Sequence, residues 1–326
     1  MNKAILLILP VIAVVMVSGC TDIPFFSGLF GPQVVKYEND IVVIRSLDVT
    51  PNTVFPEQTA RVTTYIQNQG KDEVPNVRVE LYDYCKGTFK IKDMTCNGKT
   101  ESVETSTCSI EKLSPYETRE VRWTIEADAG IKLKTICPSD GLKVSVNYPY
   151  KTEGVSTISL INSNEMQQQM SDGTYSEKQS YIVAGQGPVK GYITVEDKQP
   201  VPVGISSGDK TVIGFQLKNE GGGFLAFAPD ANPAANEKPK IRIETFDLPK
   251  AGPSMVISTE SESCSQLKPD GKIGLIQQES PKAVCSVTIT DMEAITKEST
   301  STMKFSISYN YEFRSSAKIT VMPKAM

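Results

Sequence analysis

Residues 77–83 read Val77-Arg-Val-Glu-Leu-Tyr-Asp83, and residues 241–247 read Ile241-Arg-Ile-Glu-Thr-Phe-Asp247. In both stretches apolar and polar side chains alternate with a period of two. This pattern is typical of a strand with one face in a core and the other in solvent. The two stretches therefore predict the same half-buried strand, once in each half of the chain.

Three further pairs of segments match in the same order along the chain: Asn68-Gln-Gly70 with Asn219-Glu-Gly221, Cys108-Ser-Ile110 with Cys285-Ser-Val287, and Lys143-Val-Ser-Val-Asn-Tyr-Pro-Tyr150 with Lys304-Phe-Ser-Ile-Ser-Tyr-Asn-Tyr311. The first pair carries a turn signal, and the other two retain the strand period. Ordered matches of this kind indicate an internal repeat. We therefore expect two copies of one β-sandwich.

Short alternating segments separated by turn signals are typical of immunoglobulin-like sandwiches. The fold class predicted is all-β, with two immunoglobulin-like β-sandwich domains joined by a short helix-containing linker after an N-terminal signal. The predicted ranges are a signal peptide at 1–19, a tether at 20–37, the first sandwich at 38–160, the linker at 161–187 and the second sandwich at 188–326. In the linker, Asn162 is placed to cap a helix that stops before Gly173. Trp123 shares a face with Val121 and Ile125, which predicts core packing for its ring.

The N-terminus combines one positive charge, Lys3, with an uncharged apolar run that ends at Val17-Ser-Gly-Cys20. This arrangement resembles the lipobox of prokaryotic lipoproteins, which implies cleavage before Cys20 and a diacylglyceryl group on its sulfur. The alternative is an uncleaved signal anchor, because apolar residues continue as far as Phe30. Both interpretations place the chain outside the cytoplasm, anchored to membrane lipid at the cell surface, in a bacterium or an archaeon.

Six cysteines remain after Cys20, and an even set in an oxidising compartment predicts disulfides. They are Cys85, Cys96, Cys108, Cys137, Cys264 and Cys285. Cys264 and Cys285 are the only two in the second copy. The four in the first copy allow three connectivities. Because Cys108 matches Cys285, we choose Cys96 with Cys108, which leaves Cys85 with Cys137. Free buried thiols are the alternative.

Three turn segments resemble a cell-adhesion-related domain of bacteria and archaea, often called CARDB, over about residues 41–160. They are Val49-Thr-Pro-Asn-Thr-Val-Phe-Pro-Glu-Gln58, Asn68-Gln-Gly70 and Leu113-Ser-Pro-Tyr-Glu-Thr118. The sequence departs from the family where Glu57 and Tyr116 replace the usual glycines. The resemblance implies an immunoglobulin-like surface domain.

The composition argues against several classes of function. The chain has no histidine, which removes the commonest general base near neutral pH and the commonest metal ligand. Its formal net charge of −4 gives no basic footprint, so no nucleic-acid partner is expected. We predict no catalytic residue, no metal and no cofactor.

A Gly-rich insertion in the second copy carries Phe224, Leu225 and Phe227. Apolar residues on such a loop predict a patch that binds a partner. The alternative is an edge strand packed into the core.

The function expected is that of a non-catalytic, membrane-anchored surface protein in adhesion, envelope architecture or binding to another surface protein. Its partner would be a protein or an envelope polysaccharide. The alternative is an anchored carbohydrate-binding or accessory subunit of an extracellular hydrolase. Turnover of a polysaccharide by the purified chain would favour a hydrolase and exclude the first interpretation.

Overall fold

The structure is a computed structural model that describes residues 38–101, 106–137, 141–204, 209–229, 231–249, 253–258, 262–290 and 295–323. Strands dominate this part of the chain, and the fold is an all-β sandwich. Glu38–Met326 form one compact unit. The predicted signal peptide, Cys20 and the tether lie outside the described residues.

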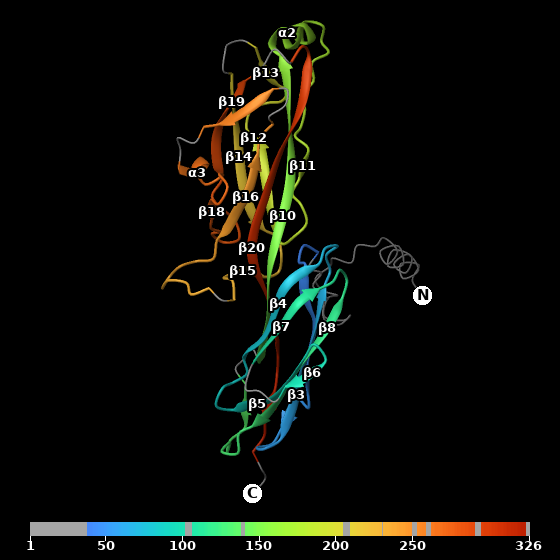
Figure 1. Cartoon of the computed structure of the whole chain (residues 1–326), viewed down its shortest axis with the longest axis vertical. Coiled ribbons are helices and arrows are strands. Elements are labelled where there is room, and N and C mark those ends of the chain that lie inside the picture. The colour runs from blue at the N-terminus through green and yellow to red at the C-terminus, as the bar shows by residue number, and fades with distance from the viewer. Residues whose placement is uncertain are drawn as a thin grey trace, which may run out of the picture. The chain divides into compact units, whose positions relative to one another are not determined.

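Four sheets make up the fold of the described residues (Figure 1). The first contains, in order, β1 (Val42–Thr50), β3 (Thr59–Asn68), β8 (Thr118–Ala127), β5 (Phe89–Cys96) and β6 (Lys99–Glu101). The second contains β12 (Val189–Val195), β14 (Lys210–Asn219), β19 (Ala283–Thr290) and β17 (Ser254–Ile257). A small third sheet contains β2 (Thr53–Val54), β21 (Thr320–Val321) and β9 (Thr135–Ile136).

The largest sheet runs in the order β18 (Lys272–Ile273), β16 (Ile241–Asp247), β20 (Glu298–Ala317), β10 (Leu142–Asn162), β4 (Val74–Asp83) and β7 (Thr107–Leu113). Beside β10 lie β11 (Ile182–Val183) and β13 (Val201–Val203), and beside β20 lies β15 (Phe224–Ala226). The short helices are α2 (Ser163–Ser171) and α3 (Glu262–Ser265). This sheet takes strands from both copies of the repeat.

Strands β10 and β20 form one antiparallel ribbon that belongs to both copies (Figure 1). Their register runs without a shift from Leu142↔Ala317 to Ile161↔Glu298. The first part of β10 pairs with β4 of the first copy, and the first part of β20 pairs with β16 of the second. Each copy therefore extends its last long strand into the sheet of the other.

This ribbon crosses the domain ranges expected from the sequence. The boundary at residue 160 falls inside β10, and the end of the chain returns to the first copy, where β21 pairs with β2. The ranges 38–160 and 188–326 therefore do not separate two sets of sheet partners. The alternating pattern continues through β10 without a break, and alternation alone does not say which sheet a strand enters.

The helix predicted after residue 161 is present as α2. The Asn162 side chain accepts a hydrogen bond from the Asn164 amide at 3.0 Å, which caps the helix. The helix ends at Ser171, two residues before Gly173, whose φ is 67°. A left-handed glycine at this place terminates the helix as expected.

The long strands of the two copies pair equivalently. In the first copy Arg78 faces Asn147 and Asp83 faces Lys143, and in the second Arg242 faces Ser308 and Asp247 faces Lys304. These registers follow the segment matches made from the sequence. The repeat is therefore present in the strand pairing as well as in the amino-acid sequence.

The match of Cys108 to Cys285 is wrong. Cys108 lies in β7 opposite Val79, whereas Cys285 lies in β19 opposite Ile213, in another sheet. The position equivalent to Cys285 belongs to Trp123, which lies opposite Val62. A three-residue match with a period of two fits almost any strand, so it could not identify the sheet.

Trp123 is in the core, as predicted. Its side chain is 0% exposed, and its indole nitrogen donates to the Ser106 carbonyl at 3.1 Å. A buried indole N–H needs such a partner. The ring therefore fills the sandwich interior.

Glu57 and Tyr116 adopt the left-handed backbone, with φ values of 68° and 60°. These are the two positions where the resemblance to CARDB domains leads us to expect glycine. A side chain in this region costs roughly 1–2 kcal/mol relative to the ordinary backbone regions. The chain carries this strain in two surface turns.

Candidate functional site

The structure contains three disulfides, Cys85–Cys137, Cys96–Cys108 and Cys264–Cys285, with Cα–Cα distances of 5.9, 5.6 and 5.6 Å. These are the pairs chosen from the sequence, although the equivalence used for that choice does not hold. Disulfides form and persist in oxidising compartments. The three bonds indicate an environment outside the cytoplasm.

Phe224, Leu225 and Phe227 are half-buried rather than displayed as a patch. Phe224 and Leu225 lie in β15, which pairs with β20 opposite Glu312 and Tyr311. The Arg314 guanidinium lies 4.3 Å from the centroid of the Phe224 ring. The structure therefore agrees with the alternative interpretation, an edge strand that packs against the fold.

Four tyrosines mark the middle of the β10–β20 ribbon. Tyr148 faces Tyr311 and Tyr150 faces Tyr309, on either side of the Pro149↔Asn310 pair. Edge-on ring contacts join them, with centroids 5.9 Å apart for Tyr148 and Tyr311 and 6.2 Å apart for Tyr150 and Tyr309. In the sequence match Tyr150 corresponds to Tyr311, so these two tyrosines occupy equivalent places in the two copies.

The second copy closes its turn onto Tyr311. The Tyr311 hydroxyl accepts from the Gly223 amide at 2.9 Å and donates to Asn219 Oδ1 at 2.9 Å. Asn219 Oδ1 also accepts from the Gly221 amide at 3.1 Å, and Asn219 Nδ2 donates to the Gly223 carbonyl. This loop therefore supplies both a donor and an acceptor to the tyrosine hydroxyl from within its own copy.

Asp40 holds the same loop from the first copy. Its side chain is buried, with 2% exposed, and its Oδ2 accepts from the Gly222 amide at 2.8 Å. Its Oδ1 has no hydrogen-bond partner among the described residues. Burial raises the pKa of this carboxyl above the ordinary 3.8, and the Gly222 N–H only partly opposes the shift.

The first copy has the same turn, but this turn makes no hydrogen bond to the equivalent tyrosine, Tyr150. Asn68 Oδ1 accepts from the Gly70 amide at 2.8 Å, and Asn68 Nδ2 donates to the Asp72 carbonyl at 2.8 Å. Nothing in this turn bonds Tyr150, whose hydroxyl makes no hydrogen bond within the described part of the chain. Burial, followed by the nearby Asp72 carboxylate, raises the pKa of Tyr150 to about 12, so the hydroxyl keeps its proton near neutral pH.

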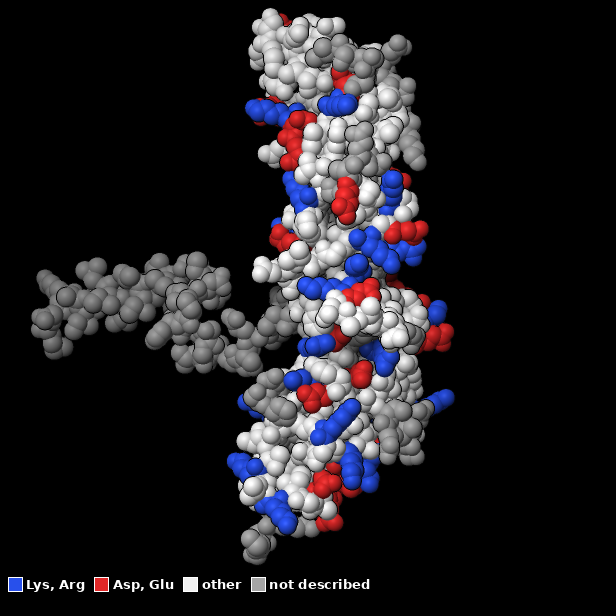
Figure 2. Space-filling model, turned by 90° about the vertical axis from the view of Figure 1, so that its left-hand side faces the viewer, with Lys and Arg blue, Asp and Glu red and all other residues white. Residues whose placement is uncertain are grey.

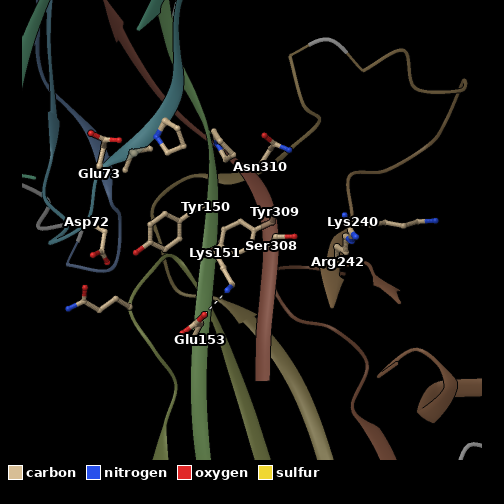
Figure 3. Close-up of a pocket in the computed structure, with 14 residues that line it drawn as sticks. Asp72, Glu73, Tyr150, Lys151, Glu153, Lys240, Arg242, Ser308, Tyr309 and Asn310 are labelled. Atoms are coloured by element: carbon tan, nitrogen blue, oxygen red, sulfur yellow. Dashed lines mark ion pairs between the residues drawn. The ribbon is translucent and has the colours of Figure 1, made fainter. Parts of the chain in front are cut away.

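Tyr150 lines a hollow of about 830 Å³ between the first turn and β16 (Figure 3). Its hydroxyl is directed toward the side where Asp72 lies. Both faces of the ribbon contribute to the lining, together with segments far apart in the sequence: Asp72 to Pro75, Pro149 to Lys151, Glu153, Gln186, Lys240, Arg242 and Ser308 to Asn310. This volume is within the usual range for ligand sites, roughly 300–1,000 Å³.

The lining of the hollow is as apolar as it is polar, and its charged side chains balance. Three carboxylates, of Asp72, Glu73 and Glu153, oppose three cations, of Lys151, Lys240 and Arg242. Some of these are already paired: Lys151 with Glu153 at 2.6 Å, Glu73 with Lys112 at 3.2 Å, and Arg242 Nε with Asp270 Oδ1 at 2.9 Å. Figure 2 likewise shows acidic and basic side chains interspersed on the face drawn, without a large patch of one sign.

Gln186 reaches the hollow because glycines let its segment approach the ribbon. A Cβ on Gly187, whose φ is 117°, would lie 2.6 Å from Tyr150 Cε1 and 2.6 Å from Thr152 Oγ1. Only glycine fits such a contact without displacement. The end of the predicted linker thus contributes to the site.

Sequence reasoning missed this hollow. Its lining comes from turns and strands that the sequence leaves up to 238 residues apart, as between Asp72 and Asn310. The available signal was the match of Tyr148 and Tyr150 to Tyr309 and Tyr311, since equivalent strands that pair with each other bring such residues together.

In the described residues no three His, Cys, Asp or Glu side chains come together as a potential metal site. No helix in this part of the chain has the length and apolar character needed to cross a lipid bilayer.

No protein-family model and no curated protein matches the chain. Among solved structures, 34% of the chain is similar to 73% of a structure described as "AvmM Catalyzes Macrocyclization in Alchivemycin A Biosynthesis", at 13% identity and a TM-score of 0.21. The chain is also similar over 87% of its length to 93% of the collagen adhesin (CNA) from S. aureus, at 12% identity and a TM-score of 0.12. Both TM-scores are low, so neither similarity bears on the function of this chain.

Proposed function

We propose that this chain is a non-catalytic, membrane-anchored cell-surface protein that acts in adhesion, envelope architecture or binding to another surface protein. The observation that carries the proposal is the set of three disulfides, which suits an all-β chain displayed in an oxidising environment. The lipobox-like residues Val17 to Cys20 support anchoring through lipid on Cys20.

The continuous ribbon supports a structural role. Because β10 and β20 join the sheets of both copies, the tyrosine pairs and the loop held by Asp40 couple the two halves. Such coupling favours a fixed arrangement of the two copies, which suits an adhesive or architectural protein.

Fractionation of tagged full-length chain and its Cys20→Ser variant tests the proposal in a host that processes lipoproteins. The native chain is expected in the membrane fraction, labelled by a fatty-acid probe, with its six other cysteines resistant to alkylation without reductant. The Cys20→Ser variant should lose the label. Recovery of both chains in the cytosol with reactive thiols would overturn the surface role.

A further inference from the structure

We propose that the outer edge of β10 at Pro149 to Glu153 binds an extended, basic peptide segment of another surface protein, which adds to the sheet as a short antiparallel strand. The inference deepens the proposed function and rests on it, because it names the kind of partner that the chain would bind. It starts from a gap in strand pairing. Within the described residues, pairing with β4 ends at Arg78↔Asn147, and pairing with β11 begins only at Val155↔Val183.

The backbone groups of alternate residues in this gap point away from β20. The Thr157 amide donates to the Tyr181 carbonyl on the outer side, and the Asn162 amide donates to the Lys297 carbonyl on the side of β20. Because β10 pairs with β20 without a register shift, its odd-numbered residues direct both N–H and C=O to the outer edge. Among the described residues, Lys151 therefore presents there an N–H and a C=O with no backbone partner.

Prolines and a left-handed residue explain why β4 leaves this gap. Continued in register, the pairing of β4 with β10 would place Asn76 opposite Pro149. Pro149 has no N–H to donate, and Asn76 has a φ of 51°, outside the strand region. Pro75, the neighbouring residue of β4, also lacks an N–H. The local sequence thus ends this pairing, while β4 still pairs with β7 as far as Val74↔Leu113.

The unpaired edge is recessed in the hollow, which limits what can reach it. The turn residues Asp72 to Pro75 lie across from β10, and Gln186 completes the lining on this edge (Figure 3). Lysine and proline commonly protect exposed edges against pairing with another sheet, and both occur here, as Lys151 and Pro149. A single extended segment of about five residues, roughly 17 Å long, matches the length of the gap. The recess therefore suits a peptide better than the edge of a second folded domain.

The side chains beside this edge favour a basic residue in the peptide. The Tyr150 ring is half-buried, and its hydroxyl is directed toward Asp72 (Figure 3). The Asp72 carboxylate is exposed and has no ion pair or hydrogen bond within the described part of the chain. A lysine or arginine of the peptide can therefore lie over the Tyr150 ring and pair with Asp72. Repulsion from Lys151 is small, because its ammonium is paired with Glu153 at 2.6 Å and lies on the other face of the ribbon.

The test uses the purified full-length chain in detergent and a labelled, capped probe peptide of seven residues, in which threonine and valine alternate around a central lysine. Fluorescence anisotropy measures the affinity, and we expect a Kd of about 10 μM to 1 mM. Asp72→Asn should weaken binding about fivefold or more, and a central glutamate in place of the lysine should weaken it further. Asp72→Asn keeps the backbone carbonyl that Asn68 bonds, so the turn is retained.

N-methylated versions of the probe test the backbone bonds without changing the protein. With the central lysine beside Tyr150, the amides of the third and fifth peptide residues face β10, and the third lies opposite Lys151. The amides of the second and sixth residues face away. Methylation of the third and fifth amides should abolish measurable binding, whereas methylation of the second and sixth should change the Kd by less than about twofold.

Tyr181→Ala is the matched control variant, because Tyr181 is an exposed aromatic outside the lining of the hollow. Its affinity for the probe should equal that of the native chain. The inference is overturned if the lysine peptide does not bind, if the glutamate peptide binds as tightly, or if both methylated peptides bind alike. A loss of affinity in Tyr181→Ala would move the site away from this edge and would also overturn it. Membrane fractionation and thiol protection are measured without the peptide, so failure of this site and failure of the surface role are distinguishable.

Discussion

The turn that follows β3 and the turn that follows β14 have the same internal bonds but different surroundings. In both, an asparagine accepts from the amide two residues on and donates to the carbonyl four residues on. The second turn also encloses Tyr311 and is held by Asp40, whereas the first leaves Tyr150 at an open hollow. The repeat therefore keeps the local turn in both copies. The turn of the second copy helps to join the two copies, whereas the turn of the first copy borders the hollow.

The largest expected effect is the loss of stability when a disulfide is removed, and this loss should differ between the two copies. Cys85–Cys137 closes 52 residues in the first copy, and Cys264–Cys285 closes 21 in the second. In the chain-entropy model their removal as double serine variants costs about 4 and about 3 kcal/mol of unfolding free energy. Denaturant titration of both variants measures the difference. A larger loss for the second pair would show that packing, not loop closure, sets the ranking.

The next effect concerns the two equivalent tyrosines. Tyr311→Phe leaves the Gly223 amide and Asn219 without the hydroxyl they share, and should cost about 1–3 kcal/mol of unfolding free energy. Tyr150→Phe removes a hydroxyl with no such partner and should change stability by less than about 0.5 kcal/mol. Thermal and denaturant unfolding of the two variants provide the measurement. Equal losses would contradict the contrast between a closed and an open turn.

The pH dependence of stability should reveal the Asp40 carboxyl. Because its pKa in the folded state is raised above 3.8, the folded state binds this proton more readily than the unfolded state. Its contribution to the unfolding free energy is therefore most favourable below pH 3.8 and is lost as pH rises through the raised pKa. Asp40→Asn keeps an acceptor for the Gly222 amide and removes the charge.

We expect the stability of the Asp40→Asn variant not to fall in this way as pH rises. At neutral pH the variant should be at least as stable as the native chain. Denaturant midpoints measured across the acid range compare the two. If the native chain instead became more stable relative to Asp40→Asn as pH rises, the result would contradict a raised pKa.

The smallest effect concerns two turns with left-handed residues. Tyr116 lies in the turn Ser114 to Glu117, and Gln278, with φ 77°, lies in the turn Ile276 to Glu279. Tyr116→Gly should raise the unfolding free energy by about 0.5–1 kcal/mol, because glycine relieves the backbone strain at a residue that is 61% exposed. Gln278→Gly should gain less, since its side chain accepts from Asn219. A destabilised Tyr116→Gly variant would assign that ring a packing role.

Much of the fold was predictable because it depends on local patterns. The period of two located the strands around Val77 and Ile241, and the capping residue located α2. The disulfide pairs were also chosen correctly, but through a false equivalence between Cys108 and Cys285. The exposure of Phe224 and Leu225 was not predictable, because their strand pairing depends on β20, a segment far along the chain.

By itself the sequence determined the all-β class, the repeated strands, the paired cysteines and the buried Trp123, since each depends on residue type and short spacing. The tertiary structure decided that the last long strand of each copy enters the sheet of the other. It also decided that Tyr150 faces a hollow while Tyr311 is enclosed. The physical reason is that alternation specifies which face of a strand is buried, while its hydrogen-bonding partners are chosen only when distant segments pack together.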